Sequence, residues 1–196
     1  MKAFEIIEIE QGSTEWHDLR KLKIGASCAP IILGISPWCS PYRLWGEMME
    51  TLRPKEQTDH MRRGVELEPI ARAQFNNELG LDMKPAVLVS IEHPWMMASL
   101  DGISYDPEFI LEIKCPGAKT IALAQEGIIP DMYLAQIQHQ FAVSGYTDGY
   151  YYVYDGNHGI AIFVKRIEPM IDKIIEKEYE FYKALIRMEP LEEWIS

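Results

Sequence analysis

The feature that most constrains the fold is a set of short β-type segments in the middle of the chain, between residues 83 and 113. The segments are rich in β-branched and other apolar residues, and turns containing proline separate them. They are Val87–Ile91, Met96–Leu100 and Phe109–Ile113, with turns at His93-Pro94 and Asp106-Pro107. This spacing predicts an antiparallel meander.

Further strands and several helices surround this meander. Residues 150–154 and 160–165 flank Asp155-Gly156-Asn157, a composition typical of a hairpin turn. Another strand is predicted at residues 3–9, and the helices are predicted at residues 14–22, 25–33, 41–52, 59–79, 118–126, 132–143 and 169–188. Helices around a small sheet indicate one α/β or α+β domain that covers residues 1–196. Residues 191–196 are either a mobile tail or a docking segment.

The clearest helical pattern covers residues 59–79 and ends at Gly80, where a left-handed residue is favoured. Apolar residues recur along it at spacings of three and four, and two charged residues fill the intervening positions of the same stripe. The stripe consists of Met61, Val65, Glu68, Arg72, Phe75 and Leu79. We therefore expect Glu68 to point inward. Pro69 predicts either a kink or a later helix start near Glu68.

Length, composition and charge limit the class of protein. With 196 residues, of which 47% are hydrophobic and 25% charged, the chain suits one soluble globular domain. No secretion signal opens the sequence, and no apolar run approaches the roughly 20 residues that cross a bilayer, so we expect a cytoplasmic protein. The net charge of -11 counts against a protein that coats nucleic acid. Any contact with DNA must be local, at a carboxylate-rich site whose sign Mg²⁺ would reverse.

Cysteine and histidine spacing argues against two other kinds of site. The three cysteines, Cys28, Cys39 and Cys115, lack Cys-x-x-Cys spacing, and the five histidines include no pair at helical spacing. Neither a disulfide framework nor a zinc hydrolase is supported. We expect reduced thiols, most of them buried.

The strongest chemical signal combines Asp101 with Glu112 and Lys114. Asp101 lies at the end of one predicted strand, and Glu112 and Lys114 share one face of the next because side chains alternate along a strand. Phosphodiester hydrolysis needs a bound metal, an activated water and a charge that stabilises the transition state. The two carboxylates suit Mg²⁺. Lys114 is able to orient the water, or to deprotonate it if its surroundings lower its pKa.

Each of these residues also has an interpretation without catalysis. Glu112 and Lys114 fit a solvated ion pair on a strand, and Asp101 fits a turn-capping residue. Glu68 adds a third carboxylate, whose burial without a partner would be costly. Its alternative is an ion pair with Arg72, one helical turn away.

Six short motifs in a fixed order separate these interpretations. They are Glu15-Trp16-His17-Asp18-Leu19-Arg20, Gly25-Ala26-Ser27, Gly64-Val65-Glu66-Leu67-Glu68, Ser99-Leu100-Asp101-Gly102, Leu111-Glu112-Ile113-Lys114-Cys115-Pro116 and Tyr133-Leu134-Ala135-Gln136-Ile137-Gln138. This set resembles the lambda exonuclease family, also called YqaJ-like, of PD-(D/E)XK nucleases. The resemblance implies a central mixed β-sheet flanked by helices, with a restriction-endonuclease-like core. Leu100 departs from the proline in the motif's name, which we expect to affect only the backbone.

The resemblance also implies a role for each motif residue. Asp101, Glu112 and the backbone carbonyl of Ile113 would bind a metal ion. Lys114 would serve the attacking water, and Glu68 would support a second metal or its waters. The implied cofactor is Mg²⁺, or Mn²⁺, with two ions per site.

Two further parts of the site are implied outside the central strands. Gln136 would complete the catalytic group from its helix, with Gln138 as the close competitor in sequence. Arg20 and Ser27 would bind a 5′ phosphate. A bidentate guanidinium and the start of a helix both suit an anion. The alternative is that Ser27 is only an N-cap and Arg20 only a surface cation.

The function implied is a 5′ to 3′ exonuclease that degrades one strand of linear double-stranded DNA and leaves a 3′ overhang for phage-type recombination. The implied partners are DNA ends, two further copies in a ring-shaped homotrimer, and a single-strand annealing protein. Two alternatives stay open. An endonuclease of the same fold would cut closed circles, and a non-catalytic DNA-binding or assembly protein would bind DNA without cleaving it.

Overall fold

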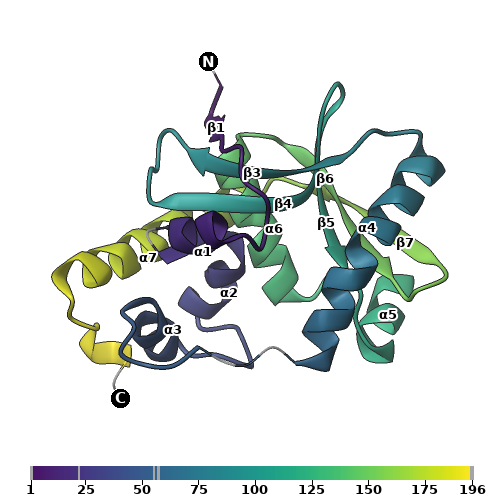
Figure 1. Ribbon diagram of the computed structural model, residues 1–196. Coiled ribbons are helices and arrows are strands. Elements are labelled where there is room, and N and C mark those ends of the chain that lie inside the picture. The colour runs from purple at the N-terminus through teal and green to yellow at the C-terminus, as the bar shows by residue number, and fades with distance from the viewer. Residues whose placement is uncertain (1, 22, 55, 57, 195–196) are drawn as a thin grey trace.

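A computed structural model describes residues 2–21, 23–54, 56 and 58–194 of the chain. Its strands form one sheet in the order β1-β3-β4-β5-β6-β7, with β2 paired to β4 beside this path. The strands are β1 (Phe4–Ile6), β2 (Ile24–Gly25), β3 (Lys84–Ser90), β4 (Met96–Tyr105), β5 (Glu108–Lys114), β6 (Asp148–Tyr154) and β7 (Gly159–Lys165). In Figure 1 the sheet crosses the upper part of the molecule, with α3 and α7 below it on the left and α4 and α5 on the right.

The predicted meander and hairpin are both confirmed. β3, β4 and β5 pair antiparallel in sequence order, and β6 pairs antiparallel with β7. β5 and β6 are parallel, which requires a crossover, and two helices supply it. The sheet is therefore mixed.

The helices lie close to their predicted positions. They are α1 (Thr14–Lys21), the 3₁₀ turn η1 (Ala26–Cys28), α2 (Ala29–Ile32), α3 (Pro41–Met48), α4 (Asp59–Leu79), α5 (Ala118–Gln125), α6 (Asp131–Ser144), α7 (Glu168–Arg187) and the 3₁₀ turn η2 (Glu192–Trp194). Local signals set several ends. The Ser40 side chain accepts a hydrogen bond from the Arg43 amide and begins α3, while Gly80 and Gly145 end α4 and α6 in the left-handed conformation.

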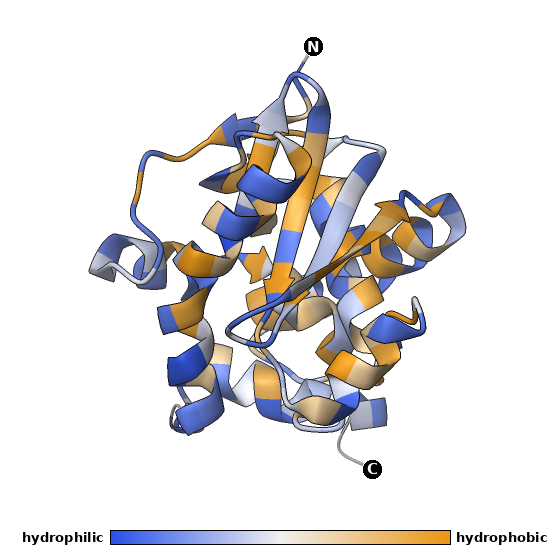
Figure 2. Cartoon of the chain, turned by 90° about the vertical axis from the view of Figure 1, so that its right-hand side faces the viewer, coloured by the Kyte–Doolittle hydropathy of each residue, from blue (hydrophilic) through white to orange (hydrophobic). Residues whose placement is uncertain are grey.

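Two faces of the sheet are covered by different helices. On one face, α6 and α7 pack against strand residues such as Leu100, Ile110 and Val153. On the other, α4 packs through Ala71 and Phe75 against Leu111, Ile113 and Tyr152. Side chains alternate between the two faces along β5 and β6, as expected for strands buried on both sides. Figure 2 shows hydrophobic residues interspersed with hydrophilic ones along both the strands and the helices.

The predicted apolar stripe of α4 is largely wrong. Phe75 is buried, but Met61, Val65 and Leu79 are 55%, 63% and 43% exposed. The helix runs unbroken through Pro69, so a start near Glu68 is also wrong. Its buried residues Ala71 and Phe75 lie in the second half of the helix. A repeat in the sequence does not tell how much of a long helix the sheet will cover.

Helix α3 ends four residues before its predicted end at Leu52. The chain reverses at Glu50, whose φ of 57° is left-handed. The amides of Thr51 and Leu52 then both bond the carbonyl of Gly46 at 2.9 Å. A Cβ at Gly46 would lie 2.6 Å from the Leu52 side chain, so this return depends on glycine.

The C-terminal segment is docked as far as the structure describes it. Leu191 and Trp194 pack on the cluster that contains Leu44, Trp45 and Phe181, and the Trp194 and Phe181 rings lie 5.1 Å apart. The prediction of a tail or docking segment therefore resolves to docking for residues 191–194, while residues 195–196 lie outside the described residues.

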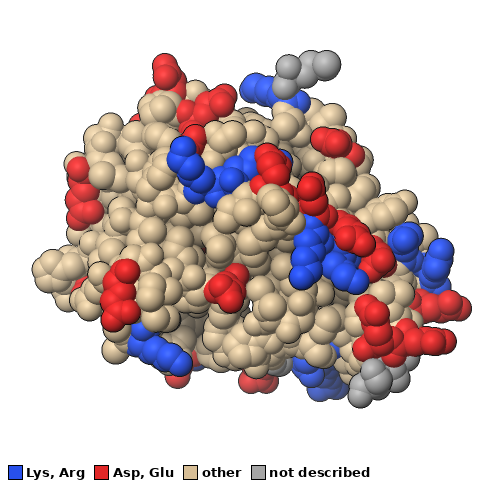
Figure 3. Space-filling view, turned by 180° about the vertical axis from the view of Figure 1, so that it is seen from behind, with Lys and Arg blue, Asp and Glu red and all other residues tan. Residues whose placement is uncertain are grey.

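The charge distribution agrees with the acidic composition. Basic and acidic side chains are intermixed on the face shown in Figure 3, and no broad, purely basic area appears in that view. Within the part of the chain that the structure describes, we find no helix both long enough and apolar enough to span a membrane.

Candidate active site

A β-bulge in β4 positions Asp101. Leu100 pairs with Ala86, and Ile103 pairs with Lys84, so three steps along β4 oppose two steps along β3. The extra residue falls at Asp101-Gly102. A bulge re-aims side chains and increases the local twist. Asp101 was expected at the end of a strand and is instead well inside β4, so its interpretation as a turn-capping residue is wrong.

The same bulge ends the pairing between β4 and β5. Their last backbone pair in this direction is Gly102 with Leu111. Beyond it, the Asp101 carboxylate replaces the missing strand partner, and its Oδ2 accepts a hydrogen bond of 2.7 Å from the Ile113 amide. The regular pairing of the two strands therefore ends where the acidic side chains are.

Alternation along β5 directs Glu112 and Lys114 toward α6. Leu111 and Ile113 pack on the α4 side, so Glu112 faces the other helix layer, where it is 1% exposed. Lys114 donates a hydrogen bond to Glu112 Oε1, and the Lys114 side chain is 25% exposed. The two residues thus form a buried pair open to solvent on the lysine side, and the interpretation as a solvated surface pair is wrong.

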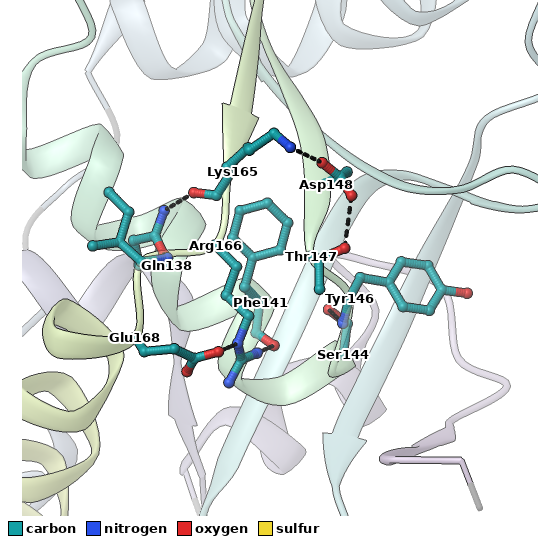
Figure 4. A network of polar contacts seen from close by, with 10 residues as sticks. Gln138, Phe141, Ser144, Tyr146, Thr147, Asp148, Lys165, Arg166 and Glu168 are labelled. Atoms are coloured by element: carbon teal, nitrogen blue, oxygen red, sulfur yellow. Dashed lines mark hydrogen bonds and ion pairs between the residues drawn. The ribbon is translucent and has the colours of Figure 1, made fainter.

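Helix α6 brings two glutamines to Glu112. Gln136 donates to Oε1 at 2.7 Å, and Gln140 donates to Oε2. Gln138 faces elsewhere. Its amide donates to the Lys165 carbonyl at 2.9 Å and accepts from the Ile167 amide at 2.7 Å, which ties α6 to the end of β7 (Figure 4). Gln140 was missed from the sequence, although its spacing of four from Gln136 puts both on one helix face.

Glu68 and Arg72 reach the site from α4. Arg72 donates to Glu68 Oε1 at 2.8 Å and to the backbone carbonyl of Asp101 at 2.6 Å. The ion pair considered as an alternative for Glu68 is therefore present. Because Arg72 also bonds the backbone carbonyl of Asp101 in the bulge, the ion pair is part of the site and does not lie on the outer side of the helix.

The electrostatics of the site reflect crowded carboxylates. Burial raises the pKa of Asp101 well above its usual value, and the nearby charges of Glu112 and Glu68 raise it further. Burial alone would lower the pKa of Lys114, but Glu112 and Asp101 outweigh it and the net shift is upward. The same two carboxylates therefore favour the charged form of Lys114 in this arrangement.

The donor set fits a hard divalent cation. Asp101 and Glu112 offer carboxylate oxygens as ligands. Repulsion between the two carboxylates contributes to the raised pKa of Asp101, and a bound divalent cation would relieve this repulsion. Across the described residues, no three His, Cys, Asp or Glu side chains are already grouped as a metal-binding cluster. Mg²⁺ suits this situation because it keeps several waters and takes one or two carboxylates from a protein.

Arg20 and Ser27 form a separate pair beside the strands. Arg20 donates to the Ser27 hydroxyl at 3.3 Å and stacks 4.5 Å above the Trp16 ring. Ser27 lies inside η1 and is not an N-cap, a place that Gly25 takes. The Trp16 indole donates to Ser99 at 2.8 Å, two residues before Asp101. A cavity of about 680 Å³ adjoins Arg20 and is lined also by Lys21, Lys23 and Arg53.

The three cysteines are described as thiols that are not joined in disulfides. Cys28 is buried, and Cys39 and Cys115 are half-buried. The expected reduced state fits the structure, whereas the expectation of mostly buried thiols holds fully for Cys28 alone among the three.

Known proteins resemble this chain in sequence and in fold. Residues 15–147 match the family model described as the YqaJ-like viral recombinase domain. The uncharacterized protein YqaJ of Bacillus subtilis (strain 168) is 31% identical over 179 residues, which are 88% of this chain. The chain spans 56% of the length of that relative.

Solved structures share the architecture. An alkaline exonuclease, LHK-Exo, from Laribacter hongkongensis matches with a TM-score of 0.76 and 26% identity, over 90% of this chain and 94% of that one. LHK-Exo in complex with dAMP matches with a TM-score of 0.78 and 24% identity over the same shares. A phage related exonuclease from Haemophilus somnus 129PT matches in fold, with a TM-score of 0.60, 15% identity, and coverage of 85% and 96%.

These likenesses agree with the bulged β4 strand, the Glu-x-Lys strand β5 and the glutamine-bearing helix α6, which all fall within the matched region. The mixed sheet flanked by helices is the PD-(D/E)XK fold that the ordered motifs led us to expect. The chain belongs to the family of YqaJ-like viral recombinase domains.

Proposed function

We propose that the chain is a nuclease domain, extending over residues 1–196, that degrades the 5′-ended strand of linear double-stranded DNA and leaves a 3′ overhang. The observation that carries this proposal is the convergence of Asp101, Glu112 and Lys114 at the point where the pairing of β4 and β5 ends. The exonucleases among the fold neighbours support the reaction class.

Asp101, Glu112 and the backbone carbonyl of Ile113 would hold a divalent metal ion. In an extended strand, the amide and the carbonyl of one residue point to the same side, and the Ile113 amide points at Asp101. The Ile113 carbonyl therefore faces the same gap as Asp101. Glu68 would support a second ion or its waters. Bound Mg²⁺, or Mn²⁺, polarises a phosphate and makes a water nucleophilic at neutral pH.

Lys114 and Gln136 complete the catalytic group around Glu112. Lys114 carries a positive charge next to solvent, where it orients a water and stabilises the negative charge that develops on the phosphate. Its ammonium also lies 5.2 Å from the centre of the Tyr133 ring, which limits its movement. Gln136 holds the same oxygen of Glu112 that Lys114 contacts.

Arg20 and Ser27 would bind the 5′ phosphate of the strand being degraded. The guanidinium has donors beyond the one used by Ser27, and a phosphate accepts them in a bidentate manner. The contacts from Arg20 to Trp16 and from Trp16 to Ser99 connect this pair to β4 close to Asp101. A 5′ phosphate bound here would place the chain end beside the carboxylates.

The assembly would be a ring-shaped homotrimer that acts with a single-strand annealing protein. The net charge of -11 disfavours a broad basic surface that would hold the duplex. A ring that encloses DNA keeps its substrate without such a surface. Mass measurement in solution, with and without duplex DNA, tests the trimer.

Digestion of linear duplex DNA labelled at one 3′ end tests the activity and its direction. We expect Mg²⁺-dependent shortening of the labelled strand from its 5′ end while its 3′ label is retained, faster with a 5′ phosphate than with a 5′ hydroxyl, and no cleavage in EDTA. Lys114→Ala should remove the activity. Arg20→Gln should reduce the preference for the 5′ phosphate by about tenfold or more, since a hydrogen bond to a charged group contributes roughly 1.5–3 kcal/mol.

A surface variant gives the matched control. Gln74→Met removes an exposed glutamine–glutamate hydrogen bond on α4, and its activity should equal that of the wild type. Cleavage of covalently closed circles would replace the exonuclease assignment with an endonuclease of the same fold. Binding of DNA ends without any Mg²⁺-dependent cleavage would overturn the enzymatic function.

A further inference from the structure

Gln140 is buried in a way that the metal site alone does not explain. It is 0% exposed, and its amide group donates to Oε2 of Glu112. Its own Oε1 is buried without a hydrogen-bond partner within the described part of the chain. A buried polar group of this kind is costly, and each instance in a folded protein calls for a reason.

The neighbouring glutamines of α6 show that this is not a general property of the helix. Gln138 is equally buried, but backbone groups satisfy both ends of its amide. Gln136 is only half-buried and shares Oε1 of Glu112 with Lys114. Gln140 differs from Gln138, because its hydrogen bond goes to the charged side chain of Glu112 and not to the backbone. Its contact therefore concerns Glu112 and not the docking of the helix.

Three side-chain donors together set the rotation of the Glu112 carboxylate group. Oε1 accepts from Lys114 and Gln136, and Oε2 accepts from Gln140. The terminal torsion of a glutamate is broad, so one engaged oxygen leaves the group free to rotate. Donors on both oxygens fix one orientation. The residue from β5 and the residues from α6 are then held as one unit.

We propose that Gln140 is a positioning residue, which fixes the rotation of the Glu112 carboxylate from the buried side so that its open edge faces the gap beside Asp101. The inference rests on the proposed function, because it assigns Glu112 to a metal ion. Groups that orient metal-binding carboxylates typically change metal affinity or activity by about ten- to a hundredfold when they are removed.

The test compares metal binding with activity. The full chain is titrated with Mn²⁺ in a calorimeter without DNA, and digestion of 5′-phosphorylated duplex is measured over a range of Mg²⁺ concentrations. We expect Gln140→Met to weaken Mn²⁺ binding by about tenfold or more and to raise the Mg²⁺ concentration for half-maximal activity. The maximal rate at saturating Mg²⁺ should fall less, because the chemical groups remain.

Two variants separate positioning from folding. Gln140→Asn keeps an amide that is too short to reach Glu112, so it should show the same weakened metal binding while the chain stays folded in a thermal melt. In a Glu112→Gln background, Gln140→Met should have no further effect on metal binding, because the residue acts through Glu112. Gln74→Met should match the wild type in every assay.

The outcomes separate a failure of the positioning role from a failure of the nuclease assignment. Wild-type affinity for Mn²⁺ in both folded Gln140 variants would overturn the positioning role and leave the nuclease assignment intact. Additive losses in the double variant would also overturn it. A wild-type chain that neither binds Mn²⁺ nor cleaves DNA would overturn the proposed function, and the positioning role with it.

Discussion

Helix α6 packs against two buried glutamates that have very different surroundings. Glu112 from β5 and Glu178 from α7 are each 1% exposed. Glu112 receives three side-chain donors, Lys114, Gln136 and Gln140. Glu178 contacts His139 at 2.7 Å through one oxygen, and its other oxygen is buried without a partner among the described residues.

The two glutamates differ in how open their surroundings are to solvent. The Lys114 side chain is 25% exposed, so the Glu112 cluster opens to solvent, whereas His139 and Glu178 are both enclosed. His139 also contacts the carbonyl of Met97 at 2.9 Å and thereby joins α6 to β4 and α7. Equal burial of a carboxylate thus serves two purposes. We propose that the Glu112 cluster receives a metal ion and a phosphate, whereas the His139–Glu178 pair holds helices and sheet together.

The largest expected effect is the loss of activity in Glu112→Gln. This change keeps the shape of the side chain and removes its charge. Since a bound metal contributes several kcal/mol to transition-state stabilisation, cleavage should fall by about a thousandfold or more. Rates on 5′-phosphorylated duplex measure it. Activity within tenfold of the wild type would show that Glu112 is no more catalytic than Glu178.

Glu178→Ala should act on stability instead. Removing one partner of a buried pair typically costs about 3–5 kcal/mol, because the other partner is left without compensation. We expect a loss of this size in urea unfolding, with the activity per folded molecule unchanged. A variant that keeps its stability and loses its activity would mean that the two clusters are one functional unit.

The pH dependence of stability should reveal the enclosed glutamate. Burial raises the pKa of Glu178 above its ordinary value of 4.5, although His139 and His93 oppose the shift. The folded state therefore binds the proton more tightly than the unfolded state. The stability from this group is complete below pH 4.5 and is lost as the pH rises through the folded pKa.

Glu178→Gln isolates this contribution. The difference in unfolding free energy between the wild type and the variant should be largest at acidic pH and should shrink as the pH rises. Its change should amount to about 1.4 kcal/mol for each unit of pKa shift. Unfolding curves on both sides of the ordinary pKa measure it, and a difference that grows with pH would contradict the assignment.

The smallest expected effect concerns Tyr151, whose ring lies on the same side of the sheet as Glu112. Its hydroxyl is buried and has no partner in the described structure. Tyr151→Phe removes an unsatisfied group that costs about 1–3 kcal/mol, so stability should stay level or rise by about 1 kcal/mol. Mn²⁺ affinity should be unchanged. Weaker metal binding would add Tyr151 to the Glu112 cluster.

Local sequence signals were sufficient to predict most of the helices and strands. The end of α4 follows from Gly80, and the β6–β7 hairpin follows from Asp155-Gly156-Asn157. The shared face of Glu112 and Lys114 follows from strand alternation, which depends only on backbone geometry. The ordered motifs identified the family and its fold, because six matches in order constrain a chain far more than any one.

Contacts between distant segments decided what these signals left open. The bulge that turns Asp101 toward Ile113 depends on how β3 and β4 align, and sequence patterns do not specify such a register shift. The upward pKa shift of Lys114 likewise depends on carboxylates from two strands. Similarly, the exposure of Met61 and Val65 reflects how little of α4 the sheet covers.

By itself, then, the sequence determined most of the secondary structure, the family and the acidic and basic residues of the central strands, since these depend on neighbours along the chain. Only the tertiary structure decided which glutamine of α6 meets Glu112 and which bonds the backbone. It alone also decided that His139 and Glu178 form an enclosed pair. Residues two or three apart on one helix face different partners, and the packing of the helix against sheet and neighbouring helix selects among them.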